Sequence, residues 1–226
     1  NYDRITIKGL KQIKSFKYHV PGDISSASFF VVLTLLSKNS KMIIEDVNIN
    51  KSRTGIIKIL NNMGANIKLK RKKIYNGEEI ANIHIKSNTN LKSINCPAKL
   101  NSSAIDEFLI IFLVAAKAKG VSSFKNLGEL NQKESPRLDI AVDILRQIGV
   151  KVERKFNNIK IFGNPNLNLQ GNYLINNFRK DHRIFMMSYI AALVLGGNWK
   201  IYDTDSVNSS FPNFFKIIKQ IKSKKN

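Results

Sequence analysis

The sequence predicts an α/β protein built from three repeats of a helix-strand-helix-strand-strand unit, with the helices packed inside and the sheets outside. One observation is that the same order of apolar-periodic segments returns after roughly 80 residues. Another is that a glycine ends the second helix of the first two copies, at Gly64 and Gly149. Because each helix must bury its apolar stripe, three such units can share one helical interior.

The first repeat, at about residues 22–90, follows Pro21-Gly22-Asp23. Its apolar periodicity predicts, in order, helix 25–37, strand 41–49, helix 53–63, and strands 65–70 and 81–86. The second repeat, at about 91–165, has the same order: helix 106–119, strand 121–127, helix 136–148, and strands 150–155 and 158–162.

The third repeat, at about 166–226, is predicted to be incomplete. It contains helix 182–195, strand 199–203 and helix 211–222, but lacks the final two strands. Residues 1–21 are expected to be the last strands of a preceding lobe, with a hinge at Gly22, and 22–226 to form one lobe. The chain begins at Asn1 without a methionine, and we expect it to be a fragment of a longer protein.

Composition restricts the classes of function. A formal charge of +21 raises the alternative of a noncatalytic module that binds a polyanion, but the lysines are scattered, and no nucleic-acid-binding motif is found. Cys96, the single cysteine, excludes an intrachain disulfide, and with no cysteine or histidine partner nearby, no metal site is expected. No apolar run is long enough to span a bilayer, so we expect a cytoplasmic protein.

Polar clusters precede corresponding helices of the repeats. They are Gly22–Ser26, Ala104–Glu107 and Asp181–Arg183 before the first helices, and Ser52–Thr54, Lys133–Arg137 and Ser209–Pro212 before the second. Helix N-termini carry free amide donors and a partial positive charge, so helix starts that gather at one end of a domain favour phosphate and carboxylate ligands. The cluster therefore predicts a site for small anions.

Several of these residues also have ordinary structural interpretations. Four of them are expected to be helix caps: Asp23, Ser25, Ser52 and Ser209. Asp106 opens an otherwise apolar helix, where a carboxylate without a partner would be costly. Arg137 and Arg183 offer bidentate geometry to an anion, but structural arginine pairs have the same pattern.

Four motifs together resemble the C-terminal half of the enolpyruvylshikimate-phosphate (EPSP) synthase family, over essentially the whole chain. They are Pro21–Ala27, Asn126-Leu127 with Lys133–Leu138, Asp181–Arg183 and Ser210–Phe214. The resemblance implies the enolpyruvyl transferase fold, in which two lobes of three repeats close on the substrates. It also implies that the extreme N-terminus of the missing lobe completes the third repeat.

By this resemblance, Asp106 accepts the proton of the attacking hydroxyl of shikimate 3-phosphate, and Lys133 contacts that substrate and the reacting centre. Glu134 matches the residue that transfers a proton at the phosphoenolpyruvate methylene carbon. Arg137 and Arg183 match the arginines that hold phosphoenolpyruvate, with His182 beside them. The implied reaction moves the carboxyvinyl group from phosphoenolpyruvate to shikimate 3-phosphate and needs no metal or organic cofactor.

Three positions depart from the family pattern: Ser209 replaces a lysine of some members, Pro136 stands where Asp is more usual, and Phe185 replaces a small residue. The missing lobe would supply further contacts to both substrates, so we expect the 226-residue chain alone to be inactive. A monomer is expected. The alternative within the same fold is UDP-N-acetylglucosamine enolpyruvyltransferase, which uses the same donor.

Overall fold

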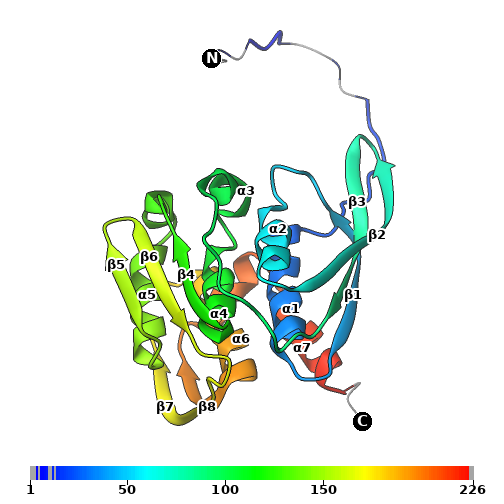
Figure 1. The fold of residues 1–226 in the computed structure, drawn as a ribbon. Helices are drawn as coiled ribbons and strands as arrows, with labels where there is room; N and C mark the ends of the chain where they lie inside the picture. Colours follow the sequence, from blue (N-terminus) through cyan, green and yellow to red (C-terminus); the bar gives the residue numbers. More distant parts are fainter. Residues whose placement is uncertain (1–3, 5, 10–11, 13, 224–226) are drawn as a thin grey trace.

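The computed structural model describes residues 4, 6–9, 12 and 14–223 of the chain. The N-terminal segment extends away from a folded α/β body (Figure 1). The described residues before Gly22 contain no strand, so the strands expected in 1–21 are not found there; residues 1–3, 5, 10–11 and 13 lie outside the description. Contact with the body comes through His19, whose backbone N–H donates to the Tyr75 hydroxyl at 3.2 Å. A strand needs a partner for its backbone groups, and the described residues before Gly22 lie in no strand pairing.

The first sheet belongs to the part of the body that follows Gly22. The elements are α1 (Ile24–Leu36), β1 (Lys41–Asn48), α2 (Gly55–Asn62), β2 (Asn66–Tyr75) and β3 (Glu78–Lys86). The three strands pair antiparallel in the order β1-β3-β2. The central strand is β3, where Ile83 lies opposite both Ile44 of β1 and Leu69 of β2. All five predicted segments are confirmed, with shifted boundaries.

The second sheet has the same strand order. Its elements are α3 (Asn101–Ala104), α4 (Phe108–Lys117), β4 (Gly120–Phe124), α5 (Arg137–Gln147), β5 (Val152–Lys155) and β6 (Asn158–Gly163), with strands in the order β4-β6-β5. The prediction of one helix from Asp106 was wrong at its start. The short α3 comes first, and Asp106 lies in the turn before α4, where the chain still has helical dihedrals at Ile105.

The third sheet has two parallel strands, of which the sequence predicted one. The elements are β7 (Leu169–Ile175), α6 (His182–Leu195), β8 (Gly196–Ile201) and α7 (Phe214–Ser223). Periodicity missed β7 because Gly171 and Asn172 interrupt it, and both residue types are poor strand formers. Pairing with β8 is what makes this segment a strand. Within the described residues, no strand follows α7.

A parallel pairing also occurs next to each of the other two sheets. Gly22 forms an isolated parallel β-bridge with Val47 of β1, and Asn95 forms one with Ser123 of β4. In all three places the chain passes through helical structure between the two paired segments, as parallel neighbours require. Each first helix is thereby held against its own sheet.

The core lies among the three most apolar helices, α1, α4 and α6, which pack against one another between the sheets (Figure 1). Every residue from Phe108 to Ala116 in α4 is buried, as expected for a helix that is apolar on all sides. Phe108, Phe112 and Phe124 form an aromatic cluster with ring centroids 5.2–5.9 Å apart. The interior formed by α1, α4 and α6 is therefore closely packed, and this packing fixes the positions of the N-termini of the three helices.

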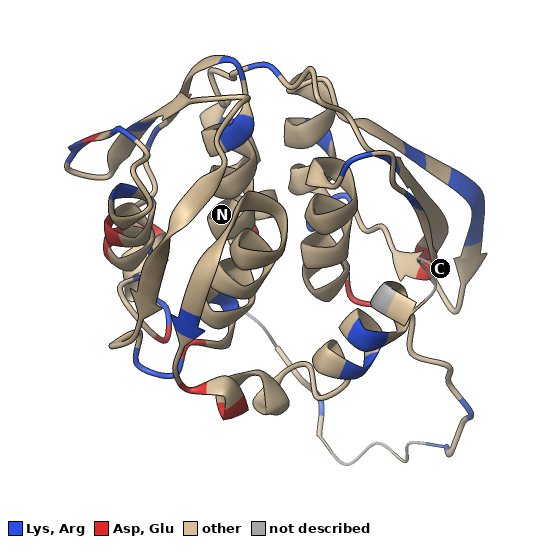
Figure 2. Ribbon diagram, turned by 90° about the horizontal axis from the view of Figure 1, so that it is seen from below, with Lys and Arg blue, Asp and Glu red and all other residues tan. Residues whose placement is uncertain are grey.

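Charge is spread over the outside of this body. Lys and Arg occur on strands, loops and helices on several sides of the ribbon (Figure 2). Among the described residues, none of the helices has both the length and the apolar character that crossing a bilayer requires. In the same part of the chain, no group of three or more His, Cys, Asp or Glu side chains is arranged to hold a metal ion.

Candidate anion-binding active site

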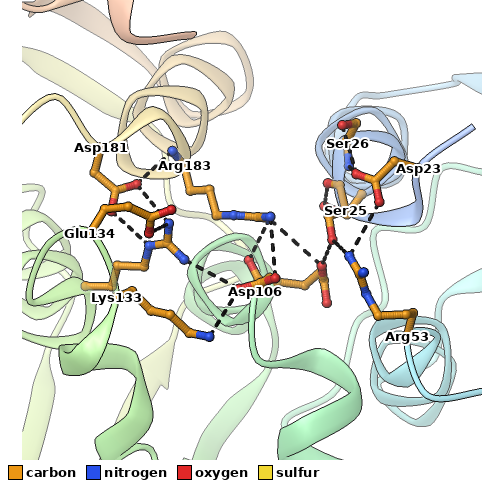
Figure 3. Close-up of polar contacts among 12 residues, drawn as sticks. Asp23, Ser25, Ser26, Arg53, Asp106, Lys133, Glu134, Asp181 and Arg183 are labelled. Atoms are coloured by element: carbon orange, nitrogen blue, oxygen red, sulfur yellow. Dashed lines mark hydrogen bonds and ion pairs between the residues drawn. The ribbon is translucent and has the colours of Figure 1, made fainter. Parts of the chain in front are cut away.

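Asp106 lies in the turn between α3 and α4, and three cationic side chains surround its carboxylate (Figure 3). Oδ1 is 3.7 Å from Nζ of Lys133 and 3.5 Å from Nη1 of Arg137. Oδ2 is 3.5 Å from Nη2 of Arg183. These distances are those of ion pairs rather than tight hydrogen bonds, so another anion can compete for the same cations.

Arg183 is placed by the start of α6. Asp181 caps this helix: its Oδ1 accepts from the backbone N–H groups of Arg183 at 2.9 Å and Ile184 at 3.4 Å. The Arg183 side chain then reaches the turn before α4, where Nη1 donates to the backbone carbonyl of Asp106 at 3.2 Å. Arg183 thus contacts both the backbone and the carboxylate of Asp106, which fixes the two relative to each other.

Arg137 is buried, with 1% of its side chain exposed, and most of its donors are already used. Nε donates to Oδ2 of Asp181 at 2.9 Å, and Ser135 Oγ donates to the same oxygen at 2.8 Å. Burial alone would raise the pKa of Asp181, but the hydrogen bonds and charge of Arg137, with those from Ser135 and the Arg183 backbone, lower it. The ionised carboxylate of Asp181 therefore binds Nε of Arg137, while Nη1 of Arg137 lies beside Asp106.

Glu134 and Lys133 come from the segment that leads into α5. The Glu134 carboxylate pairs with Nη2 of Arg137 and is more than half exposed. Nζ of Lys133 donates to Glu129 at 3.0 Å, in addition to its ion pair with Asp106. Both side chains therefore lie at the open side of the cluster, within reach of a ligand.

His182 is the first residue of α6 and is half-buried beside this cluster. Burial, followed by the positive charge of Arg183, lowers the pKa of His182, against the opposing charges of Asp181 and Glu134. The imidazole is therefore neutral at neutral pH and can donate or accept one hydrogen bond without adding to the positive charge.

Of the four expected caps, one is confirmed. Asp23 is the N-cap of α1, and its Oδ2 accepts from the Ser26 backbone N–H at 2.8 Å. Ser25 lies inside α1 and bonds elsewhere, while Ser52 and Ser209 bond to Asn50 and to the carbonyl of Ser206. These serines find local or long-range partners that a single-sequence pattern does not distinguish from capping.

Glu107 is the site residue that the sequence reasoning missed. It is 2% exposed, and Ser25 Oγ donates to its Oε1 at 2.5 Å across 82 positions of sequence. Ser25 in turn accepts from Nη2 of Arg53 at 2.9 Å (Figure 3). The signal was present, because Glu107 directly precedes nine consecutive buried residues, where a carboxyl group needs a partner.

The departures from the family pattern fit the packing of the site. Phe185 is buried two residues after Arg183, where its ring stacks on Tyr189 and meets Phe215 edge-on. Pro136 stands directly before α5, a position that tolerates its missing N–H. Phe185 therefore packs among aromatic rings of α6 and α7.

The structure thus brings the six predicted residues into one region. They come from three places: the turn before α4, the segment before α5 and the start of α6. They are Asp106, Lys133, Glu134, Arg137, His182 and Arg183. The arrangement can bind anionic groups beside a carboxylate that is able to accept a proton.

Solved structures share this fold. An EPSP synthase from Acinetobacter baumannii matches with a TM-score of 0.83 and 36% identity, over 89% of this chain and 46% of that one. The enolpyruvyl transferase NikO from Streptomyces tendae matches with a TM-score of 0.59 over 85% of this chain and 41% of that one. At 12% identity, this second likeness concerns the fold alone. The chain has the α/β fold of enolpyruvyl transferases.

Sequence comparison narrows this class. Residues 1–218 match the family described as EPSP synthase (3-phosphoshikimate 1-carboxyvinyltransferase). The 3-phosphoshikimate 1-carboxyvinyltransferase of Bacillus pumilus is 38% identical over 217 residues, which are 96% of this chain and 50% of that protein. The one of Vesicomyosocius okutanii is 39% identical over 225 residues, 98% of this chain and 50% of that protein.

The chain belongs to the EPSP synthase family. The resemblance found in four motifs is thereby confirmed. The chain spans about half the length of the curated relatives it matches.

Proposed function

We propose that this chain is the C-terminal lobe of a 3-phosphoshikimate 1-carboxyvinyltransferase. The proposed reaction transfers the enolpyruvyl group of phosphoenolpyruvate to the 5-hydroxyl of shikimate 3-phosphate and releases phosphate. The observation that carries the proposal is the carboxylate of Asp106 held among Lys133, Arg137 and Arg183. Both substrates carry phosphate and carboxylate groups, which these cations can bind while the carboxylate accepts a proton.

In this proposal Asp106 accepts the hydroxyl proton as that oxygen attacks the second carbon of phosphoenolpyruvate. Glu134, at the open side of the cluster, gives a proton to the methylene carbon, and the methyl group so formed loses a proton again as phosphate leaves, which restores the double bond of the enolpyruvyl group. Arg137 and Arg183 hold phosphoenolpyruvate, with neutral His182 beside it, and Lys133 binds shikimate 3-phosphate. The buried Arg137–Asp181 pair supports these roles because it orients the guanidinium before any ligand arrives.

We also infer that the lobe consists of three βαβαββ repeats with the helices inside, covering 22–90, 91–165 and 166–226. Equal strand orders in the first two sheets support this, as do the parallel pairings that precede them. The third sheet has two strands, β7 and β8, and would be completed from outside residues 22–226. A second lobe, joined to this one at the hinge at Gly22, would supply the remaining substrate contacts.

The proposal is tested by synthase activity with shikimate 3-phosphate and phosphoenolpyruvate in the full-length protein that contains this chain. Asp106→Ala should lower kcat by about 10²–10⁴-fold, the usual contribution of a positioned acid or base. Asp205→Ala, at an exposed aspartate that pairs with Lys180, is the matched control and should leave activity unchanged. A folded but inactive parent, or full activity in Asp106→Ala, would contradict the proposal.

Product analysis with alternative acceptors separates this reaction from that of a UDP-N-acetylglucosamine enolpyruvyltransferase, which would consume the same donor. In the view of Figure 2, Lys and Arg residues are spread over strands, loops and helices, a distribution that does not favour a polyanion-binding module. The 226-residue chain alone is expected to show no turnover, since it holds only part of the proposed site.

A further inference from the structure

Glu107 has a side chain that the proposed chemistry does not use. Glu107 directly follows Asp106 in the chain, and its carboxyl group is buried against Ser25 of α1. Ser25 of α1 donates to Oε1 at 2.5 Å, and Nη1 of Arg183 is 4.0 Å from the same oxygen. One buried carboxyl group therefore joins α1 to the arginine that contacts Asp106.

This contact extends to a second pair of residues. Arg53, just before α2, donates to Ser25 at 2.9 Å and forms an ion pair with Asp23 at 3.5 Å. The chain of contacts runs from Asp23 through Arg53, Ser25 and Glu107 to Arg183. It connects the starts of α1 and α6 and the segment before α2.

We propose that Glu107 is a positioning residue that orients Arg183 and sets the electrostatic potential around it, so that the protonation of Glu107 regulates phosphoenolpyruvate binding at the site. The inference rests on the proposed function, because it assigns phosphoenolpyruvate to Arg183. It adds a residue and a regulatory role that the proposed chemistry does not contain.

The charges around Glu107 determine when it titrates. Burial raises the pKa of its carboxyl group to about 7, against the lowering effects of the Ser25 hydrogen bond and of Arg183 and Arg53; Asp106 raises it further. These are the charged and hydrogen-bonding groups that face it from α1, from the segment before α2, from α6 and from its own turn. The carboxyl group thus changes charge near neutral pH, whereas an ordinary glutamate is ionised throughout this range.

The sign of the effect follows from the geometry. Below pH 7 Glu107 is neutral, and the full charge of Arg183 is available to Asp106 and to an incoming anion. Above pH 7 a second carboxylate 4.0 Å from Nη1 reduces the positive potential at the site. The affinity for phosphoenolpyruvate should therefore fall as pH rises through about 7.

The test measures the KM for phosphoenolpyruvate in the full-length protein from pH 5.5 to 8.5, together with the Kd of phosphoenolpyruvate alone by calorimetry. Glu107→Gln keeps the shape and the acceptor for Ser25 but cannot ionise. Relative to this variant, the wild type should lose affinity by about tenfold between the ends of the range, a usual size for coupling through a side-chain network. Comparing the two proteins cancels the titration of the ligand itself.

Two further variants distinguish positioning from a purely structural role. Ser25→Ala removes a hydrogen bond that lowers the pKa of Glu107, so the midpoint of the affinity change should move to higher pH. Glu153→Gln, at an exposed glutamate, should show the wild-type profile. A structural role would change stability without moving this midpoint.

The outcomes separate the two proposals. If the full-length protein shows no turnover but binds phosphoenolpyruvate, the proposed reaction is contradicted. The pH dependence of the Kd measured by calorimetry would still decide the role of Glu107. Identical pH profiles in the wild type and Glu107→Gln, or no phosphoenolpyruvate binding at any pH, would overturn the inference about Glu107.

Discussion

Arg137 and Asp181 form an ion pair, with Nε 2.9 Å from Oδ2, in which neither side chain has more than 1% of its surface exposed. The pair joins the start of α5 to the N-cap of α6 and so sets the spacing of the two helices that carry the arginines of the site. Removing one member would leave the other charge buried without a partner, which is the costly case for an internal ion pair.

Asp181→Asn is therefore expected to lower the free energy of unfolding by about 3–5 kcal/mol, as measured by urea denaturation of the full-length protein. Asp205→Asn removes an aspartate from an exposed pair with Lys180 and should change it by less than about 1 kcal/mol. Equal effects of the two substitutions would show that the buried pair does not stabilise the lobe.

A second prediction concerns the pH dependence of stability. The pKa of Glu107 is raised from 4.5 to about 7 in the folded protein, so folding binds a proton between these values. This stabilisation is complete below pH 4.5 and is lost as pH rises through 7. Glu107→Gln does not titrate, so the wild type should lose about 3 kcal/mol relative to the variant between pH 4.5 and 8. A difference in unfolding free energy that stays constant with pH would contradict this.

The Cys96 thiol is expected to react slowly in the native protein. Burial raises its pKa from 9.0 to about 11, so at pH 8 the thiolate fraction is about 100-fold lower than that of an ordinary thiol. A colorimetric thiol reagent should label Cys96 at least that much more slowly in the native protein than in 6 M guanidinium chloride. Equal rates would place the thiol at the surface.

The aromatic cluster under β4 should dominate the stability of the second sheet. Phe112 is fully buried against Phe108 and Phe124, so Phe112→Ala should cost about 3–5 kcal/mol in thermal or urea unfolding. Phe156 is 82% exposed in the turn between β5 and β6, and Phe156→Ala should change stability by less than about 0.5 kcal/mol. A large effect at Phe156 would indicate that this ring is covered in the full-length protein.

Much of the fold could be predicted because its signals are local. The bounds of α6 agree with the prediction at both ends, since Asp181 is a strong N-cap and Gly196 has the positive φ that ends the helix. By contrast, β7 could not be found from its own residues. Its pairing with β8 depends on a neighbour more than 20 positions away.

The same distinction applies to the site. Residue types and helix starts indicated Asp106, Lys133, Arg137 and Arg183 as candidates for an anion site, and the family resemblance implied their roles. The geometry shows in addition that Asp181 binds Nε of Arg137 and that Nη1 of Arg137 lies 3.5 Å from Asp106. Which donors of an arginine remain available depends on partners that packing brings together.

The sequence by itself determined most of the order of helices and strands, the family, and the residue types of an anion site, because periodicity, capping and motifs are properties of neighbouring residues. The tertiary structure alone decided that Ser25 meets Glu107 across 82 positions and that this carboxyl group is buried beside Arg183. Burial and long-range pairing arise only when the helices pack. For this reason the most strongly shifted carboxyl group of the site could not be identified before the fold was known.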